Sequence, residues 1–267
     1  TKEDVKKYIK LILSGKSSKY NSGSVENIIN NIDFTKWGEV SSKPLNKIKK
    51  TTGVRLQQAW QSIPHVTQFD KCDITSLEQN RVKMKNDNKY KNLKISLIPF
   101  FIKALIILLK KYPHFNSSLD ENKENLILKN YFNIGIAVDT PNGLLVPVIK
   151  DLENKSIEDI SIELSSLSKK AREKKLLPKD MEGSCFTISS LGGIGGTYFT
   201  PIINPPEVAI IGISRSEYKQ VYKDNQFQKR LILPYSLSYD HRVIDGADAA
   251  KFTSEFGLIL ENLKEII

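Results

Sequence analysis

The chain has 267 residues, of which 40% are hydrophobic, and its formal net charge is +10. This hydrophobic fraction is enough for a sizeable core, and the length suits one large domain with an extension. A strongly basic chain often binds nucleic acid, but here the lysines are spread along the whole sequence without a recognition-helix or RNP-like pattern. We therefore expect no nucleic-acid partner and assign the charge to a solvated surface or to an anionic cofactor.

Cysteine usage and apolar runs exclude two further classes of protein. Cys72 and Cys185 are the only cysteines and form no CxxC motif, which is typical of a reducing compartment and predicts no metal site; a disulfide between them stays open. The most apolar run, 97–109, is too short to span a bilayer, so we expect a buried helix and no membrane association. No signal peptide is visible, and a chain that begins with Thr1 is compatible with a fragment.

The first 36 residues are expected to form a short helix followed by a flexible linker. Val5, Ile9 and Leu13 repeat at helical intervals, which predicts a helix over 1–13. Residues 14–36 are rich in Ser, Asn and Gly, as linkers are. So short a helix does not fold by itself, so it belongs to an upstream domain or docks on the core.

From residue 37 to 267 the pattern is that of a globular domain. Four helices are expected within 41–61, 75–87, 95–112 and 156–172, and a fifth over 245–263. Strands are expected over 65–74, 125–140, 143–150, 185–191 and 207–213, followed by a hairpin over 218–239 that turns near Asp224 and Asn225. Strands and helices do not alternate regularly. We therefore predict an α/β two-layer sandwich, in which helices pack against a mixed sheet.

The glycine-rich run GGIGG, 192–196, matches no nucleotide-binding motif. It lacks the lysine of a phosphate loop and the spacing of G-x-G-x-x-G. G-x-S-x-G, the mark of a serine nucleophile, does not occur either. Any chemistry must therefore come from another set of residues.

The stretch YDHRVIDGAD, 239–248, contains one of only three histidines. Asp245 suits the N-cap of the last helix, and Asp248 suits its first turn. These structural roles leave His241 unexplained, because a strand-to-helix turn needs no imidazole. Two interpretations stay open from the residues alone: a loop histidine in a polar cluster, or a general base that takes a proton from a bound substrate.

Several blocks of the sequence resemble one known family. DHRVIDG, 240–246, is similar to the active-site signature of the acyltransferase core components of 2-oxo acid dehydrogenase complexes, which share their superfamily with chloramphenicol acetyltransferase. Further blocks in the expected order lie at 63–75, 115–119, 133–151, 185–196 and 200–213. The resemblance covers about 37–267 as the catalytic domain and is greatest to the bacterial pyruvate dehydrogenase branch. It makes 1–13 the end of a peripheral subunit-binding domain.

The resemblance implies transfer of an acetyl group from S-acetyldihydrolipoamide to coenzyme A. His241 would be the base, Ser189 would stabilise the oxyanion, with Ser190 as the alternative, and Asp245 would hold the site's geometry. Arg55 is a candidate partner of Asp245. Of the other histidines, His65 is a weaker candidate for a substrate contact, and His114 stands where relatives often have arginine.

The resemblance also implies partners and alternatives. A lipoyl group would arrive on a lipoyl domain that this chain lacks, and pyruvate decarboxylase and dihydrolipoamide dehydrogenase components would bind the assembly. Trimers would build a core of 24 chains in the bacterial cytoplasm, with His241 of one chain meeting Ser189 of its neighbour. The alternatives are succinyl or branched-chain specificity, an antibiotic acetyltransferase, and a non-catalytic scaffold, against which the intact His241, Ser189 and Asp245 argue.

Overall fold

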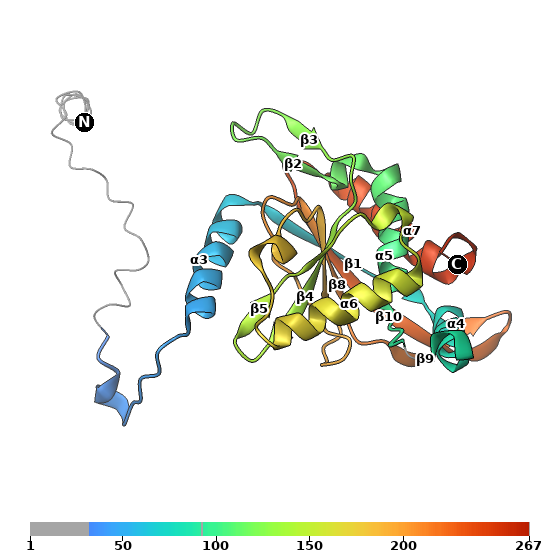
Figure 1. The fold of residues 1–267 in the computed structure, drawn as a ribbon, viewed down its shortest axis with the longest axis horizontal. Helices are drawn as coiled ribbons and strands as arrows, with labels where there is room; N and C mark the ends of the chain where they lie inside the picture. Colours follow the sequence, from blue (N-terminus) through green and yellow to red (C-terminus); the bar gives the residue numbers. More distant parts are fainter. Residues whose placement is uncertain (1–31, 92, 267) are drawn as a thin grey trace, which may run out of the picture. The chain divides into compact units, whose positions relative to one another are not determined.

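The computed structural model describes residues 32–91 and 93–266 (Figure 1). The chain divides into two units, residues 1–45 and 46–267. In the first unit the described part holds one short 3-10 helix, Phe34–Trp37, whose N-cap Asp33 accepts a hydrogen bond from the N–H of Thr35. The predicted helix over 1–13 and most of the predicted linker over 14–36 lie outside the described residues.

The second unit is an α/β structure. Its α-helices are α3 (Lys47–Ser62), α4 (Thr75–Asn86), α5 (Ile98–Lys111), α6 (Ile157–Arg172) and α7 (Gly246–Glu261). Its strands are β1 (His65–Asp73), β2 (Ser117–Leu119), β3 (Leu126–Leu128), β4 (Ile134–Thr140), β5 (Gly143–Leu145), β6 (Val148–Ile149), β7 (Phe186–Ser190), β8 (Ala209–Ile213), β9 (Glu217–Lys223) and β10 (Gln226–Asp240). In the described part of the chain no helix is both long and apolar enough to cross a bilayer.

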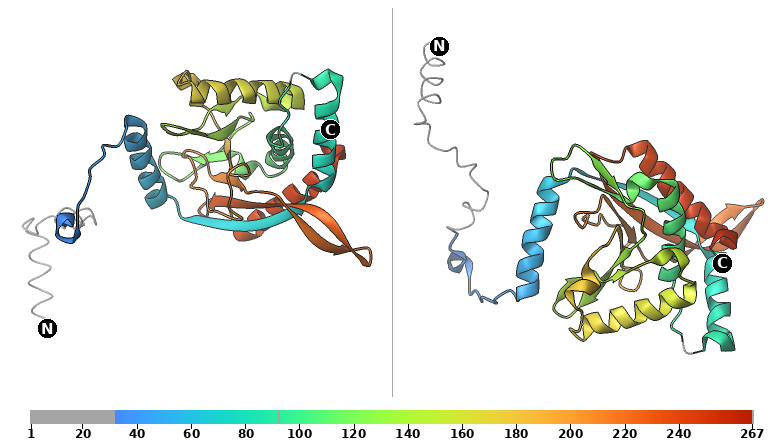
Figure 2. Two further views of the ribbon diagram at one scale, coloured as in Figure 1. Left: turned by 90° about the horizontal axis from the view of Figure 1, so that it is seen from below. Right: turned by 45° about the horizontal axis from the view of Figure 1, so that its top comes forward.

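Eight strands form one sheet, with β1, β10, β8, β7, β4 and β5 in sequence across it, β6 beside β4, and β9 beside β10. Strands β4, β7 and β8 are parallel, and the other pairs are antiparallel. The predicted mixed sheet is confirmed. The outer half of β10 pairs with β9 to form a hairpin that extends beyond the rest of the sheet (Figure 2).

One face of the sheet packs against helices. Its strands contribute alternate apolar side chains, as period-two burial requires, and α5 and α7 contribute phenylalanines. The ring of Phe252 on α7 stacks on Phe115 at a centroid distance of 4.2 Å and lies 6.0 Å from the ring of Phe186 on β7. All three side chains are fully buried. This aromatic stack joins the last helix to the middle of the sheet.

The opposite face mixes small, polar and apolar side chains. One row runs straight across five strands, and we call it the Ser189 row: Phe69, Ser236, Gly212, Ser189 and Ala137. A Cβ atom on Gly212 would come within 2.7 Å of Cζ of Phe199, so only glycine lets the segment over this row approach so closely. A small apolar cluster of Ile63, Ile203 and Ile210 lies on the same face.

Two local predictions are confirmed and one is wrong. The helix predicted over 156–172 begins as expected, where Ser156 and Asp159 form the capping box of α6, and Asp224 and Asn225 both have positive φ in the predicted hairpin turn. The single strand predicted over 125–140 is instead β3 and β4, in different sheets. The side-chain amide of Asn116 binds the carbonyl oxygens of Lys129 and Tyr131 and holds the connection out of the ladder.

The strand predicted over 143–150 is also divided, into β5 and β6. Pro147 lies between the two pieces and has no N–H to donate to a neighbouring strand. Its carbonyl oxygen still accepts the N–H of Ile136 on β4. The proline therefore interrupts the ladder without detaching the segment.

Replacing Phe252 with alanine should destabilise the fold by about 3–5 kcal/mol, because it leaves a cavity between α7 and the sheet. Chemical unfolding of the assembled protein measures the change. Phe252→Leu, which refills most of the volume, should cost much less. A loss below about 1 kcal/mol for the alanine variant would show that the stack is not a main stabilising contact.

Candidate functional site

The turn between β10 and α7 holds His241 in a fixed backbone position. The N–H of His241 donates to the carbonyl oxygen of Pro64 at 3.1 Å. The N–H groups of Val243 and Ile244 both donate to the carbonyl oxygen of Asp240 at 3.0 Å. The imidazole of His241 is exposed, and no hydrogen bond joins it to another residue that the structure describes. The backbone is thus held while the ring stays available.

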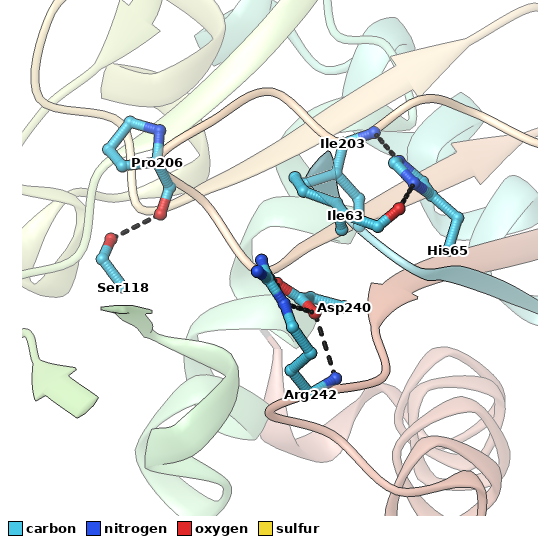
Figure 3. A network of polar contacts seen from close by, with 7 residues as sticks. All are labelled: Ile63, His65, Ser118, Ile203, Pro206, Asp240 and Arg242. Atoms are coloured by element: carbon cyan, nitrogen blue, oxygen red, sulfur yellow. Dashed lines mark hydrogen bonds and ion pairs between the residues drawn. The ribbon is translucent and has the colours of Figure 1, made fainter. Parts of the chain in front are cut away.

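The two neighbours of His241 form a tight ion pair (Figure 3). Asp240 is 2% exposed, and its carboxylate accepts hydrogen bonds from Nε of Arg242 at 2.9 Å and from Nη2 at 2.6 Å. The backbone N–H of Arg242 donates to the same carboxylate at 3.0 Å. These bonds raise the pKa of Arg242. The buried charge is therefore compensated, as a polar cluster beside an apolar strand requires.

Asp245 occupies the N-cap position of α7, as expected, but the predicted capping bond is absent: its exposed carboxylate accepts no N–H from the first turn. It lies instead near Tyr239, where it is the second cause, after burial, of the raised pKa of that phenol. Its predicted partner Arg55 is exposed on α3, and within the described part of one chain no ion pair joins the two.

Tyr239 is a site residue that the sequence analysis missed. It is 1% exposed, and its ring centroid lies 5.8 Å from that of His241. Tyr239 is thus a neighbour of both His241 and Asp245. The available signal was the alternation in YSLSYD, which places Tyr239 on the core face immediately before the turn.

Ser189 lies on β7 in the middle of the sheet and is half-buried. Its neighbours in the ladder are Ala137 on β4 and Gly212 on β8. Thr187 shares its face, and the predicted alternation places Ser190 on the other face, where it lines a cavity with Phe101. The ring of Phe199 lies against Gly212, on one side of Ser189.

Within one chain, Ser189 and His241 are far apart. Ser189 is level with Ser236 on β10, two strands away and five residues before His241. With about 3.3 Å per residue along a strand and about 4.8 Å between neighbouring strands, this offset separates the two backbones by roughly 20 Å. No side chain bridges such a distance, so the structure does not bring these two candidates together in a single chain.

A buried acid, Glu207, lies beside β7 and was also missed. Its side chain accepts hydrogen bonds from the hydroxyl of Thr187 at 2.9 Å and from the amide of Asn204 at 3.0 Å, while Oε2 has no partner. Burial raises the pKa of Glu207 to about 6, against the opposing effect of these hydrogen bonds. The acid joins β7 to the segment before β8.

A cavity of about 590 Å³ lies at the helix-facing side of the sheet, next to the ends of β7 and β8. Ser190, Gly192 and Gly193 form one wall, and apolar side chains of α5 and β10 form the floor. Arg81, Lys85, Lys94 and Glu78 also line it, which leaves an excess of positive charge. The cavity suits a ligand with an apolar part and anionic groups.

The side chains of the other two histidines, His65 and His114, contact groups of the same chain. Both ring nitrogens of His65 contact backbone groups, Ile63 O at 2.8 Å and Ile203 N at 3.0 Å, so the substrate contact considered for His65 is not supported. Nε2 of His114 lies 3.6 Å from the carboxylate of Asp248. Among the described residues, no hydrogen bond or ion pair joins either ring to His241.

Residues 32–91 and 93–266 contain no metal site and no disulfide. No group of three or more His, Cys, Asp or Glu side chains there is arranged to hold a metal ion. Cys72 and Cys185 are both free and buried, so the disulfide left open above is not formed. Burial raises the pKa of both thiols, which makes them poor nucleophiles.

Residues 38–267 match the family model of the 2-oxoacid dehydrogenases acyltransferase catalytic domain. The chain belongs to this family. A curated relative, the dihydrolipoyllysine-residue acetyltransferase component of the pyruvate dehydrogenase complex of Cupriavidus necator, is 50% identical over the whole of this chain. The chain spans about half the length of the curated relatives it matches.

Solved structures agree with this family. The dihydrolipoamide acetyltransferase of Azotobacter vinelandii is 48% identical, with a TM-score of 0.87 over 89% of this chain and 98% of that one. A structure of the cubic core of a pyruvate dehydrogenase multienzyme complex is 49% identical, with a TM-score of 0.86 and the same coverage. Chloramphenicol acetyltransferase, at 12% identity and a TM-score of 0.51, shares the fold, as predicted.

The raised pKa of Glu207 has a consequence for stability. The folded chain keeps this proton at a pH where the unfolded chain loses it, so the stabilisation is complete below the unfolded pKa of about 4.5 and is lost as the pH rises through about 6. The difference between the two pKa values corresponds to about 2 kcal/mol. Glu207→Gln should therefore stabilise the fold at pH 7.5 and have little effect at pH 4.

Chemical unfolding of the parent and of Glu207→Gln at the two pH values measures this change. Glu173→Gln is the matched control, because Glu173 is exposed and pairs with Lys175, which lowers its pKa. The control should gain no stability at pH 7.5. An equal effect of Glu207→Gln at both pH values would contradict a carboxyl group that titrates near pH 6.

Proposed function

We propose that the chain transfers an acetyl group from S-acetyldihydrolipoamide to coenzyme A, as the core of a pyruvate dehydrogenase complex. The observation that carries the proposal is the pairing of 50% identity to such acetyltransferase components with the residues His241, Ser189 and Asp245. The Azotobacter structure was part of an investigation of a serine, a histidine and an asparagine in that enzyme's catalytic mechanism. Their spacing, 52 and then four positions, is that of Ser189, His241 and Asp245.

His241 is the base of the proposed reaction. Its free imidazole takes the proton of the coenzyme A thiol as the sulfur attacks the thioester carbonyl carbon. A thiol is about two pKa units less acidic than an imidazolium, so full proton transfer costs roughly 2.7 kcal/mol, a small part of a typical barrier. When the tetrahedral intermediate collapses, dihydrolipoamide leaves and its sulfur receives the proton back from His241.

Ser189 stabilises the charge that develops on the carbonyl oxygen. Its hydroxyl donates a hydrogen bond to the oxyanion, a preorganised interaction that grows as the charge forms. The two flanking strands place only Ala137 and Gly212 beside this hydroxyl, so no large side chain of a neighbouring strand lies next to it. Asp245 holds the geometry of the His241 turn, with Arg55 as its predicted partner. The aspartate replaces the asparagine of the Azotobacter enzyme.

A complete site needs a second copy of the chain. The separation of roughly 20 Å between Ser189 and His241 excludes their cooperation within one chain. We propose that His241 of one copy approaches Ser189 of the next around a trimer, and that trimers build a cubic core of 24 chains. The similarity to a known cubic core supports this assembly. Exposed apolar side chains on α3, including Val54 and Trp60, are suited to such contacts.

We place the phosphates of coenzyme A in the positively charged cavity beside β7. Arg81 is held there by Glu78 and by the carbonyl oxygen of Ile95, so its charge is fixed, while Lys85 and Lys94 are exposed at the rim. The glycines at 192 and 193 end β7 at the cavity wall. An extended thiol arm would pass over them to reach Ser189 on the other face.

The remaining partners follow from the family. A lipoyl domain of another part of the protein or another chain delivers the acetyl group, and residues 1–13 bind the pyruvate decarboxylase or dihydrolipoamide dehydrogenase component. Free, buried cysteines support a cytoplasmic location. Succinyl or branched-chain specificity is disfavoured by the identity to acetyltransferase components.

Mixing two inactive variants tests both the chemistry and the shared site. His241→Ala and Ser189→Ala should each lower acetyl transfer between acetyl-CoA and dihydrolipoamide by at least about a hundredfold. When equal amounts are dissociated and reassembled together, about one quarter of the sites combine an intact serine with an intact histidine, so about a quarter of the parent activity should return.

Reassembling each variant alone is the control, and neither should regain activity. No recovery in the mixed assemblies would show that both residues act in the same chain. Parent-like activity in either variant alone would show that the replaced residue has no role. A parent that assembles but does not transfer acetyl, succinyl or branched-chain groups would favour the non-catalytic scaffold.

The coenzyme A cavity has its own prediction. Replacing Lys85 and Lys94 together with glutamine should raise the KM for acetyl-CoA about three- to tenfold and leave kcat nearly unchanged, because the charges attract phosphates remote from the reacting sulfur. The increase should shrink at high salt. Lys170→Gln, a change on the exposed end of α6, is the control. An unchanged KM in the double variant would place coenzyme A elsewhere.

A further inference from the structure

His65, at the start of β1, makes two hydrogen bonds that define its protonation state (Figure 3). Nδ1 lies 2.8 Å from the carbonyl oxygen of Ile63, which only accepts, so Nδ1 carries the hydrogen. The N–H of Ile203 donates to Nε2 at 3.0 Å, so Nε2 carries none. The ring is therefore a neutral imidazole that donates on one side and accepts on the other.

The ring is also held by packing. It stacks on the indole of Trp60, which lies in the last turn of α3. The ring centroids are 5.4 Å apart, and the planes are inclined by 29°. An apolar ring of the same shape would keep this stacking but lose both hydrogen bonds. The choice of histidine is thus explained by the two backbone groups and not by the packing alone.

His65 borders the turn that carries the proposed base. It is the register partner of Asp240, and the preceding residue, Pro64, accepts the backbone N–H of His241. A shift of the chain at 63–65 would therefore move the backbone of His241 directly. The hydrogen bond from Nδ1 to Ile63 closes this short stretch on itself and opposes such a shift.

On its other side, His65 holds the segment 198–206, which covers the Ser189 row. Within this segment Phe199 lies against Gly212, the neighbour of Ser189, and the ring of Tyr198 meets Phe69 edge-on at 5.5 Å. Ile203 packs in the apolar cluster on the same face and donates to Nε2 of His65. The carbonyl oxygen of Pro206 accepts a hydrogen bond from Ser118 and anchors the far end.

We propose that His65 is a positioning residue that ties the backbone turn of His241 to the segment covering the Ser189 row. The proposal rests on the proposed acetyl transfer. One neutral imidazole fixes two parts of the chain: the turn that presents the base and the cover beside the oxyanion-stabilising hydroxyl. Each belongs to a different active site in the assembled trimer, so His65 contributes to the geometry of two sites at once.

The test compares His65→Phe, which keeps the ring but neither hydrogen bond, with His65→Gln, whose amide oxygen accepts from the N–H of Ile203. Thr67→Val is the matched control, because it removes a cross-strand bond to Ser238 on the same face of β1 without contacting the His241 turn. Acetyl transfer is measured with both substrates, and sedimentation confirms that each variant assembles.

His65→Phe should lower kcat by about ten- to a hundredfold, as displacement of a catalytic group does, with each KM within about threefold of the parent. His65→Gln should recover part of the lost kcat, and Thr67→Val should keep the parent value. A kcat in assembled His65→Phe equal to that of the control would overturn the proposal, as would an equal loss in the phenylalanine and glutamine variants.

Hydrogen exchange followed by mass spectrometry separates this proposal from the proposed reaction, because it needs no turnover. Peptides containing Ile203 and His241 should exchange faster in His65→Phe than in the parent or in Thr67→Val. Unchanged exchange would show that His65 does not hold the His241 turn and the segment 198–206, even if acetyl transfer is confirmed. If the parent transfers no acyl group but these peptides still exchange faster in His65→Phe than in the parent, the positioning role of His65 is supported and the proposed reaction is refuted.

Discussion

The pairing of strand β10 with its neighbours is the constraint on which the rest of the structure depends. One edge pairs with β1 over nine residues, and the other edge pairs first with β9 and then with β8. The strand ends at Asp240, whose buried carboxylate is neutralised by Arg242. Because both edges are occupied, β10 cannot slide, and the turn that follows presents His241 at one defined place.

The same sheet that fixes His241 keeps it away from Ser189. Strand register places the serine level with Ser236, well before the end of β10. A rigid sheet makes this separation a property of the fold, so the proposed chemistry requires association. The proposed catalysis therefore depends on assembly, because a chain that fails to assemble also lacks a complete site.

Local structure could be predicted from the sequence where a few adjacent residues decide the backbone conformation. The capping box at Ser156 and the hairpin turn at Asp224 follow from side-chain hydrogen bonding and backbone preference over three or four positions. The strand over 125–140 was predicted wrongly, because Asn116, remote in sequence, binds the carbonyl oxygens that would have continued the ladder. For Asp245 the predicted N-cap position was right, but the capping bond was not, because its exposed carboxylate accepts no N–H from the first turn of α7.

The sequence by itself determined the mixed α/β class and the five helices within residues 46–266, because hydrophobic periodicity is contained in the chain's order. The candidate trio of Ser189, His241 and Asp245 came from the resemblance of its motifs to a known family. Only the tertiary structure decided that Tyr239 lies against His241, that Glu207 is a buried acid and that His65 bridges two distant backbone groups. Each of these depends on contacts between segments far apart in sequence. Such contacts are set by sheet register and packing, which no local pattern specifies.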